Sequence, residues 1–296
     1  MTWAEYFRDN RVQIAETAAL NAAGATWRAL RGAVDAGHLI RVRRGHYALP
    51  GTDVRILEAV RVGGRLACVS AAADLGVFAF DSRFAHVQVD PTGSRLRTPH
   101  DRFQLLTDQN RHGVELHWNV LMHPADGSEY RVGLIDALVQ IVRCQEPRFA
   151  LASLDSALHQ GLIPPGAISE IFAALPRETQ YLRRLVDARS EAGQETVLRF
   201  IVRQAGYEFE IQVRIHGIGR IDMIVEGCIA VEADSRQFHD GWDAHARDRT
   251  RDCELAMLGY LTLRVLYRDI MFHPERVIAA IAGLLDASRH FRRTFV

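Results

Sequence analysis

Four acidic residues in the last third of the chain have the types and spacing of a cation site. Glu232 and Asp234 are two residues apart in a predicted strand, so their side chains share one face of a sheet. Glu195 lies in the preceding predicted helix, and Asp222 lies in the strand before Glu232, where antiparallel pairing would bring its carboxylate to the pair. Carboxylate oxygens without thiolates suit Mg²⁺ or Mn²⁺, which activate water and neutralise a phosphate in transfer. The pattern therefore indicates metal-assisted hydrolysis of a phosphodiester.

Arginines near these acids have two interpretations. Arg247 and Arg251 are four residues apart in a predicted helix and share a face, so they would stabilise charge on a phosphodiester held at the acids. In the structural alternative, Arg236, Arg247 and Arg251 pair with the acids themselves as an ion-pair network. The two helix arginines would then also pair with acids close in sequence, namely Asp243, Asp248 and Asp252.

Gln237 and His239 follow directly after the predicted strand that carries the acid pair. His239 is suited to act as a general base or to hold a phosphate oxygen. A capping or packing role for His239 is the alternative. Both residues are candidates for the catalytic set because of their position beside the acids.

Hydrophobic periodicity predicts the elements that must position these side chains. A boundary near residues 190–193 precedes a regular pattern of helices and alternating strands in the order αβββαβα. The expected helices are 195–205, 244–258 and 274–285, and the expected strands are 209–215, 221–226, 229–234 and 261–266.

The first 50 residues carry seven arginines and four acids, and they predict a second kind of chemistry. Helices at 3–9, 14–22 and 26–36, followed by strands at 39–42 and 46–49, are typical of a winged helix–turn–helix. The third helix would offer side chains to a DNA major groove, and the basic wing would contact phosphate or a minor groove. A small helical domain with solvated arginines is the alternative. The candidates are Thr26, Arg28 and Arg31 in the helix and Arg41, Arg43 and Arg44 in the wing.

Residues 51–189 are less informative. They predict an α/β region with helices at 54–62, 71–75, 135–142 and 151–158 and strands at 85–90 and 114–118. Four histidines of this region, at 100, 112, 117 and 123, lack metal-ligand spacing. The four cysteines of the chain, at 68, 144, 228 and 253, form no CxxC pair, so neither a zinc knuckle nor a disulfide framework is expected.

The composition excludes several classes of mechanism and of protein. All 36 basic residues are arginine, so mechanisms that use a lysine base, a Schiff base or a P-loop lysine are excluded. The start of the chain is not typical of a signal peptide, and no apolar run is long enough to cross a membrane. We therefore expect a cytoplasmic protein with reduced thiols and no membrane partner.

The C-terminal pattern resembles the PD-(D/E)xK nuclease superfamily, and within it the very-short-patch-repair (Vsr)-like endonucleases. The resemblance covers about the last 105 residues. The N-terminal region, with Tyr47-Ala48-Leu49-Pro50, is similar to the N-terminal domain of abortive-infection (AbiEi-like) antitoxins. The segments that carry the nuclease resemblance are 190–198, Gly219-Arg220-Ile221-Asp222, 231–239, Arg247-Asp248-Arg249-Thr250-Arg251 with 252–255, and 259–265.

The nuclease resemblance implies metal ligands at Asp222, Glu232 and Glu195 and a phosphate-side histidine at His239. The lysine of the usual motif is replaced by Asp234, so Arg247, Arg251 or His239 would take over its electrostatic role. The zinc-binding cysteines of the repair enzymes are missing from this region.

These observations predict a mixed α+β fold with three parts. They are a winged helix–turn–helix at 1–50, an α/β antitoxin-like middle region at 51–189, and a restriction-endonuclease-like αβββαβα domain at 190–296. We expect an Mg²⁺- or Mn²⁺-dependent DNA endonuclease or nickase that acts on duplex DNA in repair or in defence against phages and mobile elements. The alternative is a DNA-binding autoregulator or antitoxin with a degenerate nuclease domain, and action on RNA is a third interpretation. A cognate toxin, a repair or defence protein, and a second copy of the chain are the protein partners that these expectations allow.

Overall fold

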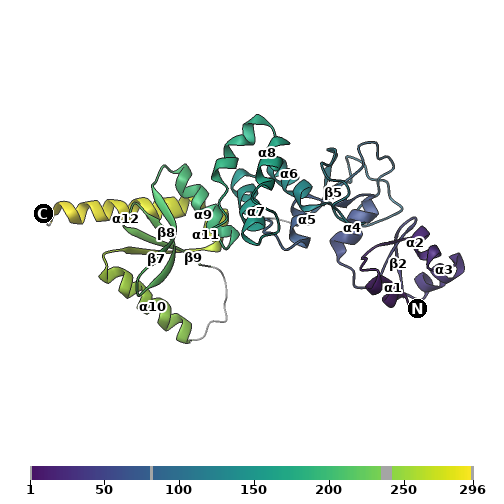
Figure 1. Ribbon diagram of the computed structural model, residues 1–296, viewed down its shortest axis with the longest axis horizontal. Coiled ribbons are helices and arrows are strands. Elements are labelled where there is room, and N and C mark those ends of the chain that lie inside the picture. The colour runs from purple at the N-terminus through teal and green to yellow at the C-terminus, as the bar shows by residue number, and fades with distance from the viewer. Residues whose placement is uncertain (1, 81–82, 235–241, 295–296) are drawn as a thin grey trace. The chain divides into compact units, whose positions relative to one another are not determined.

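The chain divides into two compact units, and each is described by itself. This computed structural model describes residues 2–80, 83–234 and 242–294, with the side chains of 242–248 and 291–294 left out of the description. Three small sheets lie among helices, so the fold is mixed α+β (Figure 1). The three-part division expected from the sequence stays a prediction. Unit 1 is Met1–Gln145 with Pro165–Gln180, and unit 2 is Glu146–Pro164 with Tyr181–Val296.

The beginning of unit 1 combines three helices with a three-stranded antiparallel sheet of order β1-β3-β2. Its elements are α1 (Trp3–Asp9), β1 (Ala15–Glu16), α2 (Thr17–Ala22), α3 (Trp27–Asp35), β2 (Ile40–Arg43) and β3 (His46–Ala48). Thr2 and Glu5 form a capping box that fixes the start of α1. The helices and the sheet share a core that includes Phe7, Leu20 and Leu30.

One sequence expectation for this part is wrong. The segment expected as one helix at 14–22 starts as strand β1, because Ala15 pairs with Tyr47 of β3 before the chain turns into α2. Trp27 has the helical spacing of a core residue, but its side chain is 67% exposed, while Leu30 and Ala33 face the core. The winged helix–turn–helix interpretation itself stays a prediction.

The rest of unit 1 packs helices against a second sheet of order β4-β5-β6. Its elements are α4 (Val54–Val62), β4 (Arg65–Leu66), α5 (Cys68–Asp74), β5 (Ala85–Gln88), β6 (Val114–His117), α6 (Leu134–Cys144) and α8 (Ala167–Ala173). β5 and β6 are parallel, and α5 packs on both β5 and α6. β4 and α8 were not expected, because two or seven residues carry too little periodicity to be recognised.

Unit 2 is built on a four-stranded sheet of order β10-β9-β8-β7. Its elements are α7 (Pro147–His159), α9 (Gly193–Gln204), β7 (Phe209–Ile215), β8 (Gly219–Val225), β9 (Ile229–Asp234), α10 (Trp242–Met257), β10 (Leu261–Leu266), α11 (Tyr267–Phe272) and α12 (Pro274–Thr294); a 3-10 helix, η1 (Arg177–Leu185), precedes α9. β7, β8 and β9 run antiparallel, and β10 joins β9 in parallel. From α9 onward the order matches the expected αβββαβα, with α11 inserted before the last helix. In Figure 1, α10 lies on one side of the sheet and α9 on the other.

A buried ion pair fixes helix α9 against α7. Arg199 Nη2 donates to Asp155 Oδ2 at 2.5 Å, and the two side chains are 4% and 1% exposed. Thr196 Oγ1 donates to the same carboxylate oxygen at 2.8 Å, and Arg199 Nη1 donates to the carbonyl of Leu185 at 2.7 Å. Breaking a buried, hydrogen-bonded pair is costly, so this network holds α9, and with it Glu195, in one place. In the described residues, every helix is too short or too polar to cross a lipid bilayer.

Candidate active site

Asp222 and Glu232 face each other on adjacent antiparallel strands. The β8–β9 register pairs Met223 with Val231, and one further step along it sets Asp222 opposite Glu232. Asp222 Oδ2 accepts a hydrogen bond from the backbone N–H of Ala233 at 3.0 Å, which holds the carboxylate at this end of the ladder. Like charges directly opposite each other destabilise a sheet. The strand pairing therefore stores a repulsion that a cation or a guanidinium would relieve.

Glu195 completes this group, which we call the acid cluster (Glu195, Asp222 and Glu232). Its Oε2 accepts hydrogen bonds from Gln212 Nε2 at 2.8 Å and from the backbone N–H of Glu191 at 3.0 Å. Gln194 Nε2 donates to the carbonyl of Ala233 at 2.9 Å and joins the start of α9 to the end of β9. Glu195 thus reaches the sheet from a helix that is fixed at its start and near its middle.

The electrostatics confirm that the three acids interact. Burial, and after it the negative charge of Asp222, raise the pKa of Glu195 to about 7. The pKa of Glu232 is also raised to about 7 by burial and then by Asp222, with Arg251 and Arg264 opposing the rise. Two carboxyls with such pKa values in a small volume are characteristic of functional sites, although ion-pair networks produce the same effect.

Arg251 contacts the acid cluster directly. Its Nη2 lies 2.9 Å from Glu232 Oε1, and the same nitrogen donates to the carbonyl of Arg220. Ile224 and Ala230 share a sheet face with Asp222 and Glu232, and they pack against Leu255 of α10. Because Leu255 lies one helical turn after Arg251, α10 places Arg251 at this face. The ion pair that the sequence left open as an alternative is present for this arginine.

The structure describes the other predicted residues of the site to different extents. Asp234 is exposed at the end of β9, where the register pairs it with Leu266 of β10. Arg247 belongs to α10, but its side chain lies outside the description. Gln237 and His239, together with Arg236, lie outside the described residues.

Gln212 is a residue of the site that the sequence did not reveal. The β7–β8 ladder pairs Ile211 with Met223 and Val213 with Ile221, and Gln212 lies between them opposite Asp222. Its φ of 56° is in the left-handed region, which is uncommon for a residue other than glycine. A polar residue inside an alternating strand was the available signal, but the left-handed backbone of Gln212 has no sequence signature.

The candidate DNA-contacting residues of unit 1 differ in their exposure and in their contacts within the protein. Arg28, Arg41 and Arg44 are exposed. Arg31 is exposed too, with Asp35 at 3.8 Å and the Trp27 ring 5.5 Å from its guanidinium carbon. Thr26 and Arg43 both serve the fold: the Thr26 hydroxyl caps α3, and Arg43 Nη1 donates to the carbonyl of Val62 at 3.0 Å. Burial lowers the pKa of Arg43.

Comparisons with known proteins bear on the C-terminal part. The family model REase_MTES_1575, a restriction endonuclease-like domain, matches residues 194–285, which include the whole acid cluster and Arg251. The uncharacterized proteins MT2308 and Rv2248 of Mycobacterium tuberculosis, from strains CDC 1551 / Oshkosh and ATCC 25618 / H37Rv, are each 29% identical to the chain over 271 residues, covering 86% of the chain and 94% of the relative. No solved structure matches. The C-terminal region therefore carries a restriction endonuclease-like domain, which suggests a nuclease.

Proposed function

We propose that the chain is a metal-dependent DNA endonuclease or nickase whose site is the acid cluster. The observation that carries the proposal is the convergence of Glu195, Asp222 and Glu232 from one helix and two adjacent strands, within the segment that matches a restriction endonuclease-like domain. Three carboxylates in one partly buried group are poorly compensated by a single contacting arginine. They are suited to hold a divalent cation beside a phosphodiester.

The residues present fit an Mg²⁺ or Mn²⁺ ion. Gln212 Oε1 is buried and accepts no hydrogen bond from the described residues, so an oxygen atom with free lone pairs is available beside the carboxylates. Oxygen ligands of this kind match the preference of these two cations. Asp222, Glu232 and Glu195 would hold the ion, which supplies Lewis-acid polarisation of the phosphate and activation of water.

The chain's own residues have separate roles in this proposal. Gln212 orients Glu195 through its amide hydrogen bond, and Arg251 provides a fixed positive charge beside Glu232. With no lysine in the chain, a carboxylate of the cluster is the group suited to accept a proton from the attacking water. Arg251 and Arg247 would stabilise the charge that develops on the phosphate.

Delivery to duplex DNA is assigned to the first 50 residues. The order of helices and strands, with a sheet of order β1-β3-β2, supports the proposal of a winged helix–turn–helix. Helix α3 would enter the major groove with Arg28 and Arg31, and the exposed Arg41 and Arg44 would contact phosphate. Repair and defence against phages or mobile elements are the settings in which such a targeted nuclease would act.

A second candidate function is supported by the Arg251–Glu232 ion pair. An arginine that neutralises Glu232, with Asp234 in place of the usual lysine, fits a nuclease fold that no longer cuts. The chain would then be a DNA-binding autoregulator or antitoxin with salt-dependent operator binding. In that case Arg28 and Arg31 matter for function, and Glu232 does not.

Cleavage assays with the full chain test the first candidate. Supercoiled plasmid and labelled duplex, single-stranded and mismatched oligonucleotides are incubated with Mg²⁺ or Mn²⁺. We expect nicking or cutting of duplex substrates and a loss of at least about 100-fold in Asp222→Asn, since metal-ion catalysis supplies several kcal/mol. Equal activity of Asp222→Asn overturns the assignment of the site. Duplex binding without cleavage under either metal favours the second candidate.

A further inference from the structure

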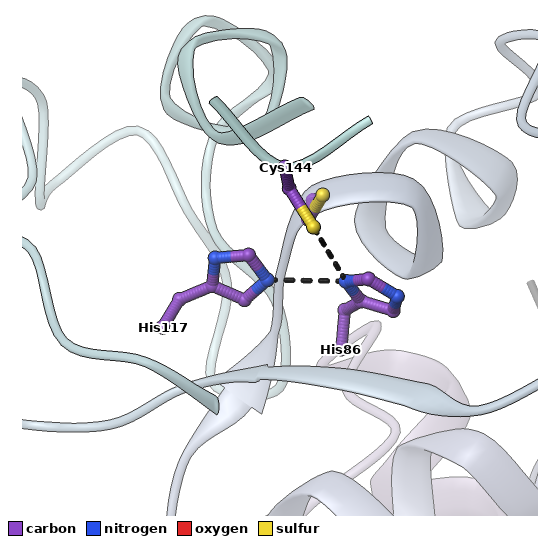
Figure 2. Close-up of side chains that lie close together, drawn as sticks. His86, His117 and Cys144 are labelled. Carbon is purple, nitrogen blue, oxygen red and sulfur yellow. Dashed lines mark hydrogen bonds between the residues drawn. The ribbon is translucent and has the colours of Figure 1, made fainter. Parts of the chain in front are cut away.

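Four side chains far apart in sequence converge in unit 1, and we call them the Cys/His cluster. The Sγ atoms of two cysteines and one ring nitrogen from each of two histidines all lie within 4.8 Å of one another. Figure 2 shows the side chains of His86, His117 and Cys144 turned toward a common point. The members are Cys68 at the start of α5, His86 in β5, His117 at the end of β6 and Cys144 at the end of α6.

The strand pairing of unit 1 explains how the two histidines meet. β5 and β6 are parallel, with His86 opposite Glu115 and Gln88 opposite His117. Because side chains alternate along a strand, His86 and His117 lie diagonally on one face of this pair. His86 Nδ1 and His117 Nε2 are 3.1 Å apart, and the rings stack with centroids 5.3 Å apart.

The two cysteines are brought over this face by helices α5 and α6, which pack on each other. Cys68 has a φ of 48°, and its backbone N–H donates to Gln140 Oε1 of α6 at 2.9 Å. Gln140 Nε2 in turn donates to Gln88 Oε1 of β5 at 2.6 Å. A strained cysteine backbone held by buried hydrogen bonds from both neighbouring elements indicates that the fold specifies where this thiol lies.

Two separations among the ligand atoms are close to those of a tetrahedral site. With zinc bonds of about 2.3 Å to sulfur and 2.0–2.1 Å to nitrogen, a regular tetrahedron separates two nitrogens by roughly 3.3 Å and nitrogen from sulfur by roughly 3.6 Å. The corresponding separations are 3.1 Å for His86 Nδ1 to His117 Nε2 and 3.9 Å for Cys144 Sγ to His86 Nδ1. Small side-chain adjustments would bring all four atoms onto one ion.

Burial also fits a metal centre. Cys68 is fully buried, and His86 and His117 are 7% and 9% exposed. Cys144 is exposed, which leaves a path by which an ion enters. A neutral ring nitrogen is the form of histidine that binds a metal.

We propose that Cys68, His86, His117 and Cys144 bind one zinc ion as a structural site of unit 1. Two thiolates with two imidazoles are a zinc ligand set, and four protein ligands leave no position open for a substrate, which is characteristic of structural rather than catalytic zinc. The ion would join α5, β5, β6 and α6 at one point. This site is separate in chemistry and in position along the chain from the oxygen ligands of the acid cluster.

The metal content of the purified full chain, freed of any affinity tag and kept reduced, tests the proposal. We expect about one zinc per chain in the wild type. Cys144→Ser should lose the zinc, and because this side chain is exposed, the variant should still fold. The matched control is Cys253→Ser, which changes another exposed cysteine outside the cluster and should keep its zinc.

Replacement of zinc by Co²⁺ identifies the ligands. The chelator-treated chain with one equivalent of Co²⁺ should show the intense visible bands of a tetrahedral ion and thiolate-to-cobalt charge-transfer absorption. These bands should survive in Asp222→Asn and disappear in Cys144→Ser. Weak octahedral bands alone, zinc retained by Cys144→Ser, or a Cys68–Cys144 disulfide in the reduced preparation by mass spectrometry would each overturn the proposal.

Discussion

The acid cluster and the Cys/His cluster differ in how the chain assembles them. The acid cluster draws Asp222 and Glu232 from neighbouring strands of one hairpin, where the ladder itself sets them opposite each other. The Cys/His cluster draws its ligands from two helices and two parallel strands that are separated by long connections. Local pairing makes the first cluster visible in a sequence, and packing between distant elements hides the second.

The ligand chemistry differs as sharply as the assembly. Carboxylate oxygens suit hard cations that keep bound water and contact phosphate, while thiolates with imidazoles suit zinc held by protein atoms alone. Our account therefore assigns chemistry to the acid cluster and stability to the Cys/His cluster. Each prediction below tests this division of roles.

After changes at Asp222 and Glu232, the largest loss of cleavage activity is expected for Glu195→Gln. This change keeps the size of the side chain but removes the charge that would hold a cation, so we expect cleavage to fall by roughly 10- to 100-fold. Initial rates of plasmid nicking in Mn²⁺ measure it. The matched control is Glu210→Gln, an exposed residue of β7 in the same sheet, which should cut like the wild type. If both variants cut equally, Glu195 is not part of the site.

Zinc removal is expected to act on stability. A ligand that binds only the folded chain at about 100 times its Kd adds about 2.7 kcal/mol, which corresponds to roughly 5–10 °C in Tm for a unit of this size. We expect chelation to lower the Tm of the wild type by this amount, and zinc, but not Mg²⁺, to restore it. Differential scanning calorimetry of the wild type and Cys144→Ser checks this, because the variant should not respond to zinc. A Tm that is restored by Mg²⁺ and not by zinc would contradict the assignment of stability to the Cys/His cluster.

A smaller effect is expected in the pH dependence of stability. Glu195 and Glu232 have folded pKa values raised from 4.5 to about 7, so the folded chain holds protons that the unfolded chain loses at lower pH. Their contribution is full below pH 4.5 and is lost as the pH rises through about 7. Without a divalent cation, Tm should therefore fall between about pH 5 and 8, and Glu232→Gln should flatten this fall. A wild-type Tm with no such decline would show that the pKa values of Glu195 and Glu232 are not raised in the folded chain.

The smallest effect is expected for single arginines of unit 1. Arg28→Ala and Arg31→Ala should each weaken duplex binding and lower its salt slope, since each would remove one cation from the major groove. Arg43→Ala is the matched comparison, because its guanidinium is held by the carbonyl of Val62. Fluorescence anisotropy over a series of salt concentrations measures all three. Equal slopes in the wild type and all variants would remove α3 from the DNA-binding surface.

Much of unit 2 was predictable because its elements obey simple periodicities. Strict alternation gave the bounds of the strands 209–215, 229–234 and 261–266 as the structure has them. Helix α11 was missed because it follows β10 with no turn residue between Leu266 and Tyr267. The orientation of Gln212 was missed because it depends on a left-handed backbone at a residue other than glycine.

Less of unit 1 was predictable, and for a physical reason. β5 and β6 have only four residues each, and their parallel pairing joins segments that carry no common pattern. His117 was judged by its spacing from His100, His112 and His123, and His86 was not considered. Spacing along the chain has no meaning when the register of distant strands brings His86 to His117. Cys68 and Cys144 were likewise judged as distant, and only the packing of α5 on α6 brings their sulfur atoms together.

The most direct test of the central claim is the rate at which Glu232→Gln nicks supercoiled plasmid in Mn²⁺, beside the wild type and Glu210→Gln at equal folded concentration. Our account predicts nicking by the wild type and Glu210→Gln and none detectable with Glu232→Gln. Nicking by Glu232→Gln at the wild-type rate would contradict it, as would duplex binding by all three proteins with no cleavage by any.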